Sequence, residues 1–491
     1  MMQAKNGRED VLIIGSGVGG LTAGIILAKL HHPVRIVESN PVPGGLLCSY
    51  VRGGIECPTG VHYMGSLDQG QPLRRLWDYL GVTSLIPLER MDGIIDRYLF
   101  NDFSFDLCEG IDNFEDALLR AFPQEHQLIT TIMSDMREIS RSFSSLDALF
   151  SSEIGTFMPD YFSSMGEQLL RLGCSSRLFS VLGVPANLIG VPLRECPIFY
   201  YHMTIASYLL SSWRLACGSS QMANAFVSRL ESLGGEVMTG DGVERILVQA
   251  GRIKGVVLRS GRILEATSII AAVHPGNVVA MLPKGAVRPA YEERINQLEN
   301  TKGLFSATIA VNAEAHKALP YNIYRLCREK DGTLSQGVFH QLRSSGQPGI
   351  NILSMMTESG SEEWRRWKDT KSGKRGSDYA EAKEQKACEF IGKAEKIFGP
   401  LKDARILDTY TPLTIRDIVG SPDGSAYGIL RSTRQLMKTA SLQRTSIAGL
   451  FLAGQNGVAP GIMGTTLGSF QTVKRLIGHE RFSREVLGAL L

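Results

Sequence analysis

The chain has 491 residues, of which 43% are hydrophobic and 21% are charged, and its formal net charge is +3 at pH 7. This is the composition of a folded globular protein with ample apolar residues for a core, and it excludes a wholly disordered chain. The near-neutral charge and the lack of a basic stripe with interleaved aromatic residues argue against nucleic acid as a partner.

The chain begins with a pattern of strand, glycine loop, helix and strand. Its first ten residues are polar and lack the apolar region of a signal peptide. The apolar run 11–14 predicts a strand buried on both faces, residues 21–30 predict a helix, and residues 34–37 predict a second strand. The loop Gly15-Ser16-Gly17-Val18-Gly19-Gly20 matches GxGxxG, so this region predicts a Rossmann-type dinucleotide-binding unit in an α/β fold.

Each part of this unit has a physical task. Gly15 permits the tight turn, Gly17 lets the backbone approach a pyrophosphate, and Gly20 lets helix and strand pack closely. The phosphates are expected at the helix N-terminus, where unpaired N–H groups point at them. Glu38 ends the second strand and is placed to bind ribose hydroxyls, so FAD or NAD is favoured over NADP. Further predicted contacts in this unit are Ser16, Val18 and Ser39.

A second glycine-rich segment follows the predicted ribose-binding acid. Gly44 and Gly45, followed by Leu46, permit close backbone approach to a bulky ligand. Residues 53–63 are glycine-interrupted and not helical, whereas an NAD enzyme would continue with another strand and helix. Four residues of this segment are predicted to contact the cofactor: Thr59, Gly60, Val61 and His62.

The middle of the chain changes character twice. Residues 66–212 are mostly helical in pattern, with short strands near 93–105, and residues 214–283 return to α/β character. Aromatic residues are dense in the helical part. This density predicts either the packed core of a substrate domain or the wall of a hydrophobic tunnel or membrane-facing surface. The aromatic residues are Phe150, Phe157, Tyr161, Phe162, Phe179, Phe199, Tyr200, Tyr201 and Tyr208.

Two further segments precede the C-terminal region. Residues 304–357 read as strands, and we expect a sheet that forms a wall of the substrate site. Residues 362–398 are rich in charge and predict either solvated helix and loop or a basic membrane-facing patch. The basic residues concerned are Arg365, Arg366, Lys368, Lys371, Lys374 and Arg375.

The C-terminal region repeats the order of strand, glycine loop and helix. Residues 450–453 predict a buried strand, two glycine-rich stretches follow, and the helical pattern begins at Thr465. A second helix N-terminus directed at the ligand can stabilise negative charge, as on a reduced flavin, which favours FAD over NAD. The predicted cofactor contacts here are Gly454, Gln455, Gly461, Ile462 and Met463.

Taken together, these segments resemble the phytoene desaturase, carotenoid isomerase and retinol saturase family of FAD enzymes, nearly end to end. Besides the Rossmann unit, the resemblance rests on residues 59–63, Cys217-Gly218-Ser219-Ser220, residues 243–246, the hairpin-like 251–261 and the loop 454–464. It implies that Val243 meets the adenine through its backbone and that residues 454–464 wrap the ribityl chain and isoalloxazine. Residues 59–63, residues 411–414 with 424–428, and Gly454-Gln455 are most similar to the retinol saturase branch. Cys57-Pro58 departs from the family's Phe-Asp, and the final loop mixes saturase-like and desaturase-like features.

The resemblance implies redox chemistry on C=C bonds of an apolar polyene or isoprenoid, with saturation as the leading hypothesis. Desaturation or cis–trans isomerisation is the nearest alternative. An amine oxidase-like flavoenzyme is a further one, although residues 459–463 lack that group's aromatic cage. The last alternative is a non-enzymatic flavin-binding scaffold or lipid carrier. Because no second nicotinamide motif is present, electrons are expected from an external donor such as a ferredoxin, a quinone or a separate reductase.

Proton transfer has two pairs of candidate residues. His62 and Tyr63 lie in the segment that the resemblance places near the flavin, and Tyr427 and Arg416 precede the C-terminal loop. A structural role remains open for His62, Tyr427 and Arg416. No GxSxG, HExxH or P-loop motif is present, which favours a cofactor-driven mechanism.

The predicted architecture is a discontinuous pair of domains. Residues 1–65, 213–290 and 440–491 are expected to form the Rossmann-type FAD-binding domain with its parallel sheet. Residues 66–212 and 291–439 are expected to form an interleaved mixed-sheet and helical substrate domain. The eight cysteines show no CxxC pair or zinc spacing, which predicts reduced thiols and no metal site. Without an apolar run of spanning length, we expect a cytoplasmic protein, either soluble or peripheral on a membrane surface.

Overall fold

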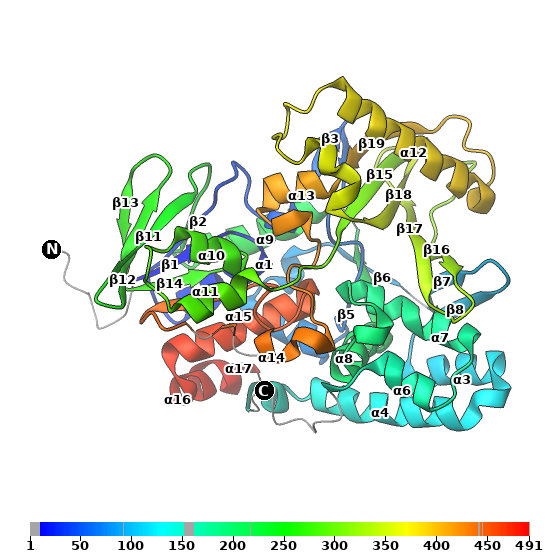
Figure 1. Ribbon diagram of the computed structural model, residues 1–491, viewed down its shortest axis with the longest axis horizontal. Helices are drawn as coiled ribbons and strands as arrows, with labels where there is room; N and C mark the ends of the chain where they lie inside the picture. Colours follow the sequence, from blue (N-terminus) through cyan, green and yellow to red (C-terminus); the bar gives the residue numbers. More distant parts are fainter. Residues whose placement is uncertain are drawn as a thin grey trace.

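A computed structural model describes residues 10–91, 93–151, 162–216, 218–439, 442–443 and 445–490. Two sheets dominate the structure, a parallel sheet near the N-terminus and a larger mixed sheet, with a group of helices beneath the larger one (Figure 1). Cys217, Phe157 and Tyr161, which the sequence analysis singled out, lie outside the described residues.

The parallel sheet has five strands in the order β10-β2-β1-β14-β20, and all of its pairs are parallel. The strands are β10 (Glu236–Met238), β2 (Val34–Val37), β1 (Val11–Ile14), β14 (Ser268–Ala271) and β20 (Leu450–Leu452). They come from three distant parts of the chain, 11–37, 236–271 and 450–452, so the sheet is discontinuous in sequence. The predicted Rossmann-type α/β fold is confirmed, whereas the domain boundaries stay a prediction.

Strand β1 is buried on both faces, as its unbroken apolar sequence predicted. Val11 and Ile13 pack with three helices, α1 (Val18–Lys29), α9 (Ser219–Ser232) and α15 (Gly461–Ile477). Leu12 and Ile14 face the opposite side. There they join a three-stranded sheet and two helices: β11 (Val243–Gln249), β12 (Arg252–Leu258), β13 (Ile263–Glu265), α10 (Pro275–Met281) and α11 (Pro289–Asn296).

The larger sheet has seven strands in the order β19-β15-β18-β17-β16-β7-β8. Its pairs are antiparallel except β16 with β7, which run parallel with Asn322 opposite Asp96. One face packs against α12 (Ser377–Phe398), and the other faces the rest of the molecule. The strands are β7 (Ile94–Leu99), β8 (Ser104–Cys108), β15 (Gly303–Asn312), β16 (Asn322–Arg328), β17 (Leu334–Ser344), β18 (Ile350–Ser359) and β19 (Arg405–Tyr410).

Most of the predicted helical region forms a layer below this sheet (Figure 1). The region contains α2 (Pro72–Leu80), which instead packs against α1 and α15, and α3 (Ile111–Ala121), α4 (His126–Ser144), α5 (Leu146–Ser151), α6 (Met165–Arg171), α7 (Ser176–Gly183) and α8 (Ile198–Leu210). Most of the singled-out aromatic residues are core: Phe150, Phe179, Phe199, Tyr200 and Tyr201 are buried. The core interpretation therefore holds for these five.

Short elements connect the layers. A hairpin, β3 (Tyr50–Arg52) with β4 (Ile55–Cys57), occupies the glycine-interrupted segment, and β5 (Met64–Gly65), β9 (Ser212–Leu215) and β6 (Leu88–Met91) form a small sheet. The remaining helices are α13 (Pro412–Val419), α14 (Leu436–Thr439), α16 (His479–Phe482) and α17 (Gly488–Leu490). Helix α15 begins at Gly461, four residues before the predicted start, so the second glycine stretch forms the first turn of the helix.

The charge-rich segment is partly engaged in ion pairs. Arg366 lies 3.0 Å from Asp378, Arg365 lies 3.3 Å from Glu362, and the buried Arg375 pairs with Asp417. These contacts favour the interpretation as a surface helix and loop over a free basic patch. No helix in the described part of the chain is long and apolar enough to cross a membrane.

Candidate functional site

A cavity of about 670 Å³ lies between the parallel sheet and the larger sheet. Its lining includes Ile14 and Val37 at the carboxyl ends of β1 and β2, and Tyr324 and Phe339 on strands of the larger sheet. In open α/β sheets, ligands bind outside the carboxyl ends of the strands. The volume is that of a small-molecule or cofactor site.

The N-terminus of α1 forms one end of the cavity. Gly15, Gly17 and Val18 line it, and no side chain caps the helix at Gly17. No described atom lies within 4 Å of a Cβ added at Gly17, whereas a Cβ at Gly20 would lie 2.0 Å from the Gly15 carbonyl oxygen. Gly17 thus leaves room for a ligand, and Gly20 allows α1 to pack against the loop.

Glu38 connects the loops at this end of the cavity through hydrogen bonds. Its buried carboxylate accepts hydrogen bonds from the backbone N–H and hydroxyl of Ser16, at 3.0 and 2.7 Å. Asn40 donates two more, from its backbone and side chain, and the Ser39 hydroxyl donates a fifth. Glu38, Ser39 and Val243 all line the cavity, which places the predicted ribose and adenine contacts together.

The second glycine segment closes over the first. The backbone N–H of Gly44 donates to the Ser16 hydroxyl at 3.2 Å, and a Cβ added at Gly45 would lie 3.3 Å from the Cα of Gly17. Ser16 itself is fully buried behind this contact and does not line the cavity in the described structure. The cavity-lining residues of this part are Gly44, Gly45, Leu46, Thr59, Gly60 and Val61.

A second helix N-terminus reaches the same cavity. No side chain caps α15, and its first residues Gly461, Ile462 and Met463 line the cavity with Gly454 and Gln455. A Cβ added at Gly19 would lie 2.5 Å from the Gly454 Cα, so the two glycine loops touch. Two positive helix ends therefore face one cavity, an arrangement that favours a ligand with separated negative groups.

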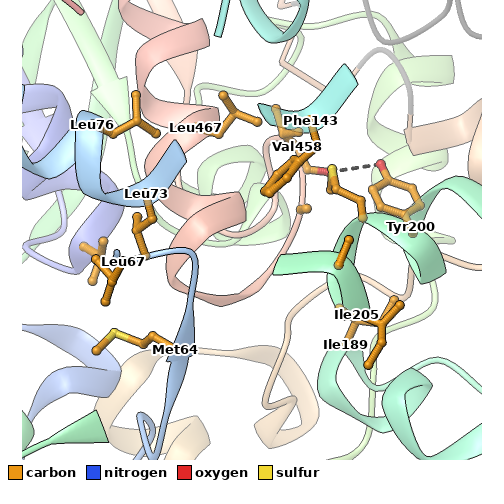
Figure 2. Packing of buried hydrophobic residues seen from close by; sticks show 14 of the residues in the cluster. Met64, Leu67, Leu73, Leu76, Phe143, Ile189, Tyr200, Ile205, Val458 and Leu467 are labelled. Carbon is orange, nitrogen blue, oxygen red and sulfur yellow. Dashed lines mark hydrogen bonds between the residues drawn. The ribbon is translucent and has the colours of Figure 1, made fainter. Parts of the chain in front are cut away.

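The far part of the cavity is apolar. Figure 2 shows the buried hydrophobic core beside it, with side chains from α2, α4, α8 and α15 and with the Tyr200 hydroxyl donating to the Val458 carbonyl at 3.1 Å. Of the residues labelled in Figure 2, Met64, Leu73, Phe143 and Ile189 line the cavity. Tyr63, Tyr208, Tyr324 and Phe339 add an aromatic wall; the Tyr63 and Tyr208 ring centroids lie 4.9 Å apart.

His62 lines the cavity as a neutral ring. Its Nδ1 lies 3.4 Å from the Gln341 side-chain oxygen, and its Nε2 has no hydrogen-bond partner among the described residues. Burial lowers the pKa of His62 to about 4. The imidazole is therefore uncharged at neutral pH and poorly suited to donate a proton there.

Tyr63 belongs to a buried hydrogen-bonded group. Its hydroxyl lies 3.0 Å from the Asp96 carboxyl and 3.0 Å from the Tyr324 hydroxyl. The other Asp96 oxygen accepts a hydrogen bond from the Asn322 amide at 2.9 Å. Both tyrosines line the cavity, while Asp96 is buried behind them.

The remaining two catalytic candidates lie apart. Tyr427 lines the cavity, and burial raises its pKa to about 12. Arg416 is not among the described residues that line the cavity: its guanidinium pairs with Asp417 and donates to the carbonyls of Lys368 and Thr370. Because these contacts fix α13 against the preceding loop, we assign Arg416 a structural role.

Several cavity residues were missed by the sequence analysis. Tyr324 and Phe339 come from elements that were predicted only as strands, and Ile418 to Ser421 line the cavity at the C-terminal end of α13. The one signal in the sequence was Asp96, an acid within a strand-like run two residues before Tyr98. A lone acid in such a run is too common a pattern to identify a site.

Comparisons with known proteins agree with the resemblance. A family model described as an NAD(P)-binding Rossmann-like domain matches residues 13–80. An all-trans-retinol 13,14-reductase of Macaca fascicularis is 25% identical over 96% of this chain and 86% of its own length. A prolycopene isomerase of Arabidopsis thaliana is 23% identical over 91% and 79%, and an all-trans-zeta-carotene desaturase of Myxococcus xanthus is 23% identical over 53% and 52%. Over most of its length, the chain is thus similar to all-trans-retinol 13,14-reductases and to a prolycopene isomerase, and over about half of it to a carotenoid desaturase.

Solved structures share the fold of this chain. An oxidoreductase from Methanosarcina mazei has a TM-score of 0.64 at 16% identity, covering 95% of this chain and all of that one. A putrescine oxidase bound to putrescine has a TM-score of 0.65 at 13% identity, covering 96% and 99%. The α/β architecture is thus shared nearly end to end with known enzymes.

Proposed function

We propose that this protein is an FAD-dependent oxidoreductase that saturates a C=C bond of an apolar polyene or isoprenoid. One observation carries the proposal: a single cavity joins two uncapped helix N-termini at its glycine loops to an apolar, aromatic wall. The nearly full-length similarity to all-trans-retinol 13,14-reductases supports the same reaction class, an oxidoreductase acting on CH–CH groups.

The residues at the dinucleotide end fit FAD. The open space at Gly17 and the uncapped start of α1 suit a pyrophosphate, while Glu38 and Val243 suit the adenosine. The uncapped start of α15, with Gly461 to Met463, suits the electron-rich edge of an isoalloxazine ring. When bound, the flavin supplies hydride chemistry, and the protein holds the substrate and provides the proton.

The apolar end of the cavity determines the substrate class in this proposal. Phe143, Ile189 and Phe339 offer contacts without charge, and Tyr63 and Tyr324 bring hydroxyl groups to the same wall. Such a surface suits a hydrocarbon chain, because its burial is favourable without a compensating ion pair. Association with a membrane, from which such a substrate would be taken, stays a prediction.

Isomerisation is a second candidate, since a prolycopene isomerase is among the relatives over 91% of this chain. The same cavity would hold a polyene while its double bond is rearranged without net redox change. An amine oxidase activity has weaker support, because putrescine oxidase shares the fold at only 13% identity.

Anaerobic stopped-flow mixing tests the proposal. Chemically reduced holoenzyme is mixed with all-trans-retinol, and the flavin absorbance is followed; a fully saturated alcohol of similar length is the control. We expect reoxidation with the polyene alone. Protein that cannot be reconstituted with flavin, or flavin that stays reduced with every polyene tried, would overturn the proposal.

A further inference from the structure

A chain of hydroxyl groups connects a buried carboxyl to the cavity. From Asp96 on β7, the contacts run to the Tyr63 hydroxyl at 3.0 Å and on to the Tyr324 hydroxyl at 3.0 Å. Asp96 is 1% exposed, Tyr63 is 8% exposed, and Tyr324 is partly exposed in the cavity wall. The chain thus leads from the interior to the apolar part of the cavity.

The hydrogen bonds of Asp96 are all to neutral groups. Its Oδ1 accepts from the Asn322 amide at 2.9 Å, and its Oδ2 contacts the Tyr63 hydroxyl. The Asn322 side-chain oxygen accepts in turn from Gln341 at 3.0 Å, so the amide N–H₂ is directed at Asp96. Because Oδ1 already accepts a hydrogen bond, a proton on this carboxyl belongs on Oδ2, facing Tyr63.

The protonation of Asp96 sets the direction of the whole chain. When Oδ2 carries a proton, it donates to Tyr63, Tyr63 donates to Tyr324, and the Tyr324 O–H is free to donate into the cavity. When Asp96 is ionised, Tyr63 donates to it and Tyr324 donates to Tyr63, so the cavity meets only an acceptor. The three side chains can therefore present or withhold a proton.

We propose that Asp96, Tyr63 and Tyr324 form a proton relay in which Tyr324 is the catalytic proton donor to the substrate and Asp96 is the positioning and reservoir residue. The inference rests on the proposed function, because it names the proton source for saturation. Among the earlier candidates, it keeps Tyr63 and replaces His62, whose ring is neutral and whose Nδ1 faces Gln341.

With this relay, the protons and electrons of the saturation reaction balance. One alkene carbon receives a hydride from reduced flavin, and the other receives the Tyr324 proton, so two C–H bonds replace the π bond. The Tyr324 oxygen takes the proton of Tyr63, and Tyr63 takes that of Asp96. Asp96 is left ionised until water in the cavity returns a proton to it through Tyr324 and Tyr63. The alkene gains two electrons, which the reduced flavin loses.

Burial affects each member of the relay. It raises the pKa of Asp96 to about 7, so both protonation states are populated at neutral pH. It holds the pKa values of Tyr63 and Tyr324 well above 10, so the proton passes along the chain in a concerted movement, without a lasting tyrosinate.

The other titratable groups near Asp96 do not compete for this role. Tyr98 on β7 and Tyr208 on α8 are tyrosines whose pKa values burial also raises, so both stay neutral. Arg97 and Asp106, on β7 and β8, form an ion pair with each other at 2.7 Å.

The pH profile of single-turnover saturation tests the relay, with all-trans-retinol and pre-reduced holoenzyme. We expect the wild-type rate to fall as pH rises through an ionisation near 7, because deprotonated Asp96 reverses the hydroxyl chain. Asp96→Asn should abolish this ionisation, and Tyr63→Phe and Tyr324→Phe should each lower the rate by about 10²-fold. Tyr208→Phe, which removes a cavity hydroxyl outside the relay, is the matched control and should retain the ionisation. An unchanged profile in Asp96→Asn overturns the relay.

A second readout does not depend on activity. Infrared spectra of protein labelled with ¹³C-aspartate should show a protonated carboxyl C=O band that disappears as pH rises through about 7 and that is missing in Asp96→Asn. Absence of this band in the wild type at acid pH overturns the relay. If the band titrates but no polyene is reduced, the proposed function fails while the buried acid stands.

Discussion

Two buried acids in this molecule have opposite surroundings, and this difference assigns their roles. Glu38 receives five hydrogen bonds and lies at the glycine loops. Asp96 has only an amide and a tyrosine as partners, and burial raises its pKa to about 7. Glu38 is therefore an acceptor that orders the glycine loops, whereas Asp96, buried with two neutral partners, can exchange a proton.

Replacing Glu38 should weaken cofactor binding. Glu38→Gln keeps the size of the side chain but turns one acceptor oxygen into a donor that faces other donors. Since hydrogen bonds to charged groups contribute about 1.5–3 kcal/mol each, we expect FAD affinity to fall at least about tenfold. Calorimetric titration of apoprotein with FAD measures this, with the exposed Glu236→Gln on neighbouring β10 as the control. Equal affinity in the wild type and Glu38→Gln would contradict the assigned role.

The sequence alone identified Glu38 as a binding residue, but it did not indicate the role of Asp96. Glu38 follows a glycine motif at a fixed spacing, so local sequence defines its position. Asp96, Tyr63 and Tyr324 come from three separate segments, and they meet because β7 and β16 pair in parallel within a largely antiparallel sheet. A single sequence contains no signal for that pairing.

At the scale of elements, α1 and α15 meet through glycines. The contact between Gly19 and Gly454 lets the two helices start beside the same cavity. The sequence predicted both helices, but it placed the start of α15 at Thr465 because residues 460–464 have the composition of a loop. In the structure, tertiary packing extends the helix to Gly461, so the glycines are part of its first turn.

Two glycines of the first loop should respond differently to alanine. Gly20→Ala places a Cβ 2.0 Å from a carbonyl oxygen, so we expect a loss of about 1–3 kcal/mol in the free energy of unfolding. Gly17→Ala meets open space at a φ of −65°, so stability should hold while FAD affinity falls. Denaturant unfolding and FAD titration of both variants check this; a stable Gly20→Ala or a fully FAD-competent Gly17→Ala would be inconsistent with this geometry.

Helix α8 carries a buried histidine that should make the fold acid-sensitive. Neither ring nitrogen of His202 has a hydrogen-bond partner among the described residues, and burial lowers its pKa to about 3. The unfolded chain binds a proton near pH 6.5 and the folded chain does not, so stability is lost as pH falls below that value.

His202→Phe should remove this sensitivity. Between pH 8 and pH 5, we expect the wild type to lose about 2 kcal/mol relative to the variant. Contributions from His62, His340 and Asp96 are present in both proteins and cancel. Urea unfolding at the two pH values measures the difference; parallel loss of stability in both proteins would show that His202 is not the cause.

At the scale of the whole molecule, the cavity is assembled from distant segments. Residues near 15, 62, 324 and 461 line it together, and the two sheets form its two ends. The sequence predicted the presence of both parts, because each has its own periodicity. The two parts share one cavity because the chain passes from one part to the other and back.

The electron source can be tested on the intact protein. Because the sequence holds no second nicotinamide motif besides the glycine loop assigned to FAD, we expect NADPH alone to reduce the bound flavin only slowly. Stopped-flow absorbance under anaerobic conditions follows this reduction, with dithionite as the positive control. Rapid bleaching by NADPH would show that no separate donor is needed.

The mass of the product distinguishes saturation of a C=C bond from isomerisation and desaturation. Chemically reduced holoenzyme is mixed anaerobically with all-trans-retinol and a panel of carotenoids, and the products are analysed by liquid chromatography and mass spectrometry. We expect a product that has gained two hydrogens. A product of unchanged mass and altered retention time, or a product that has lost two hydrogens with oxidised enzyme and a quinone, would contradict saturation and assign the cavity to isomerisation or desaturation.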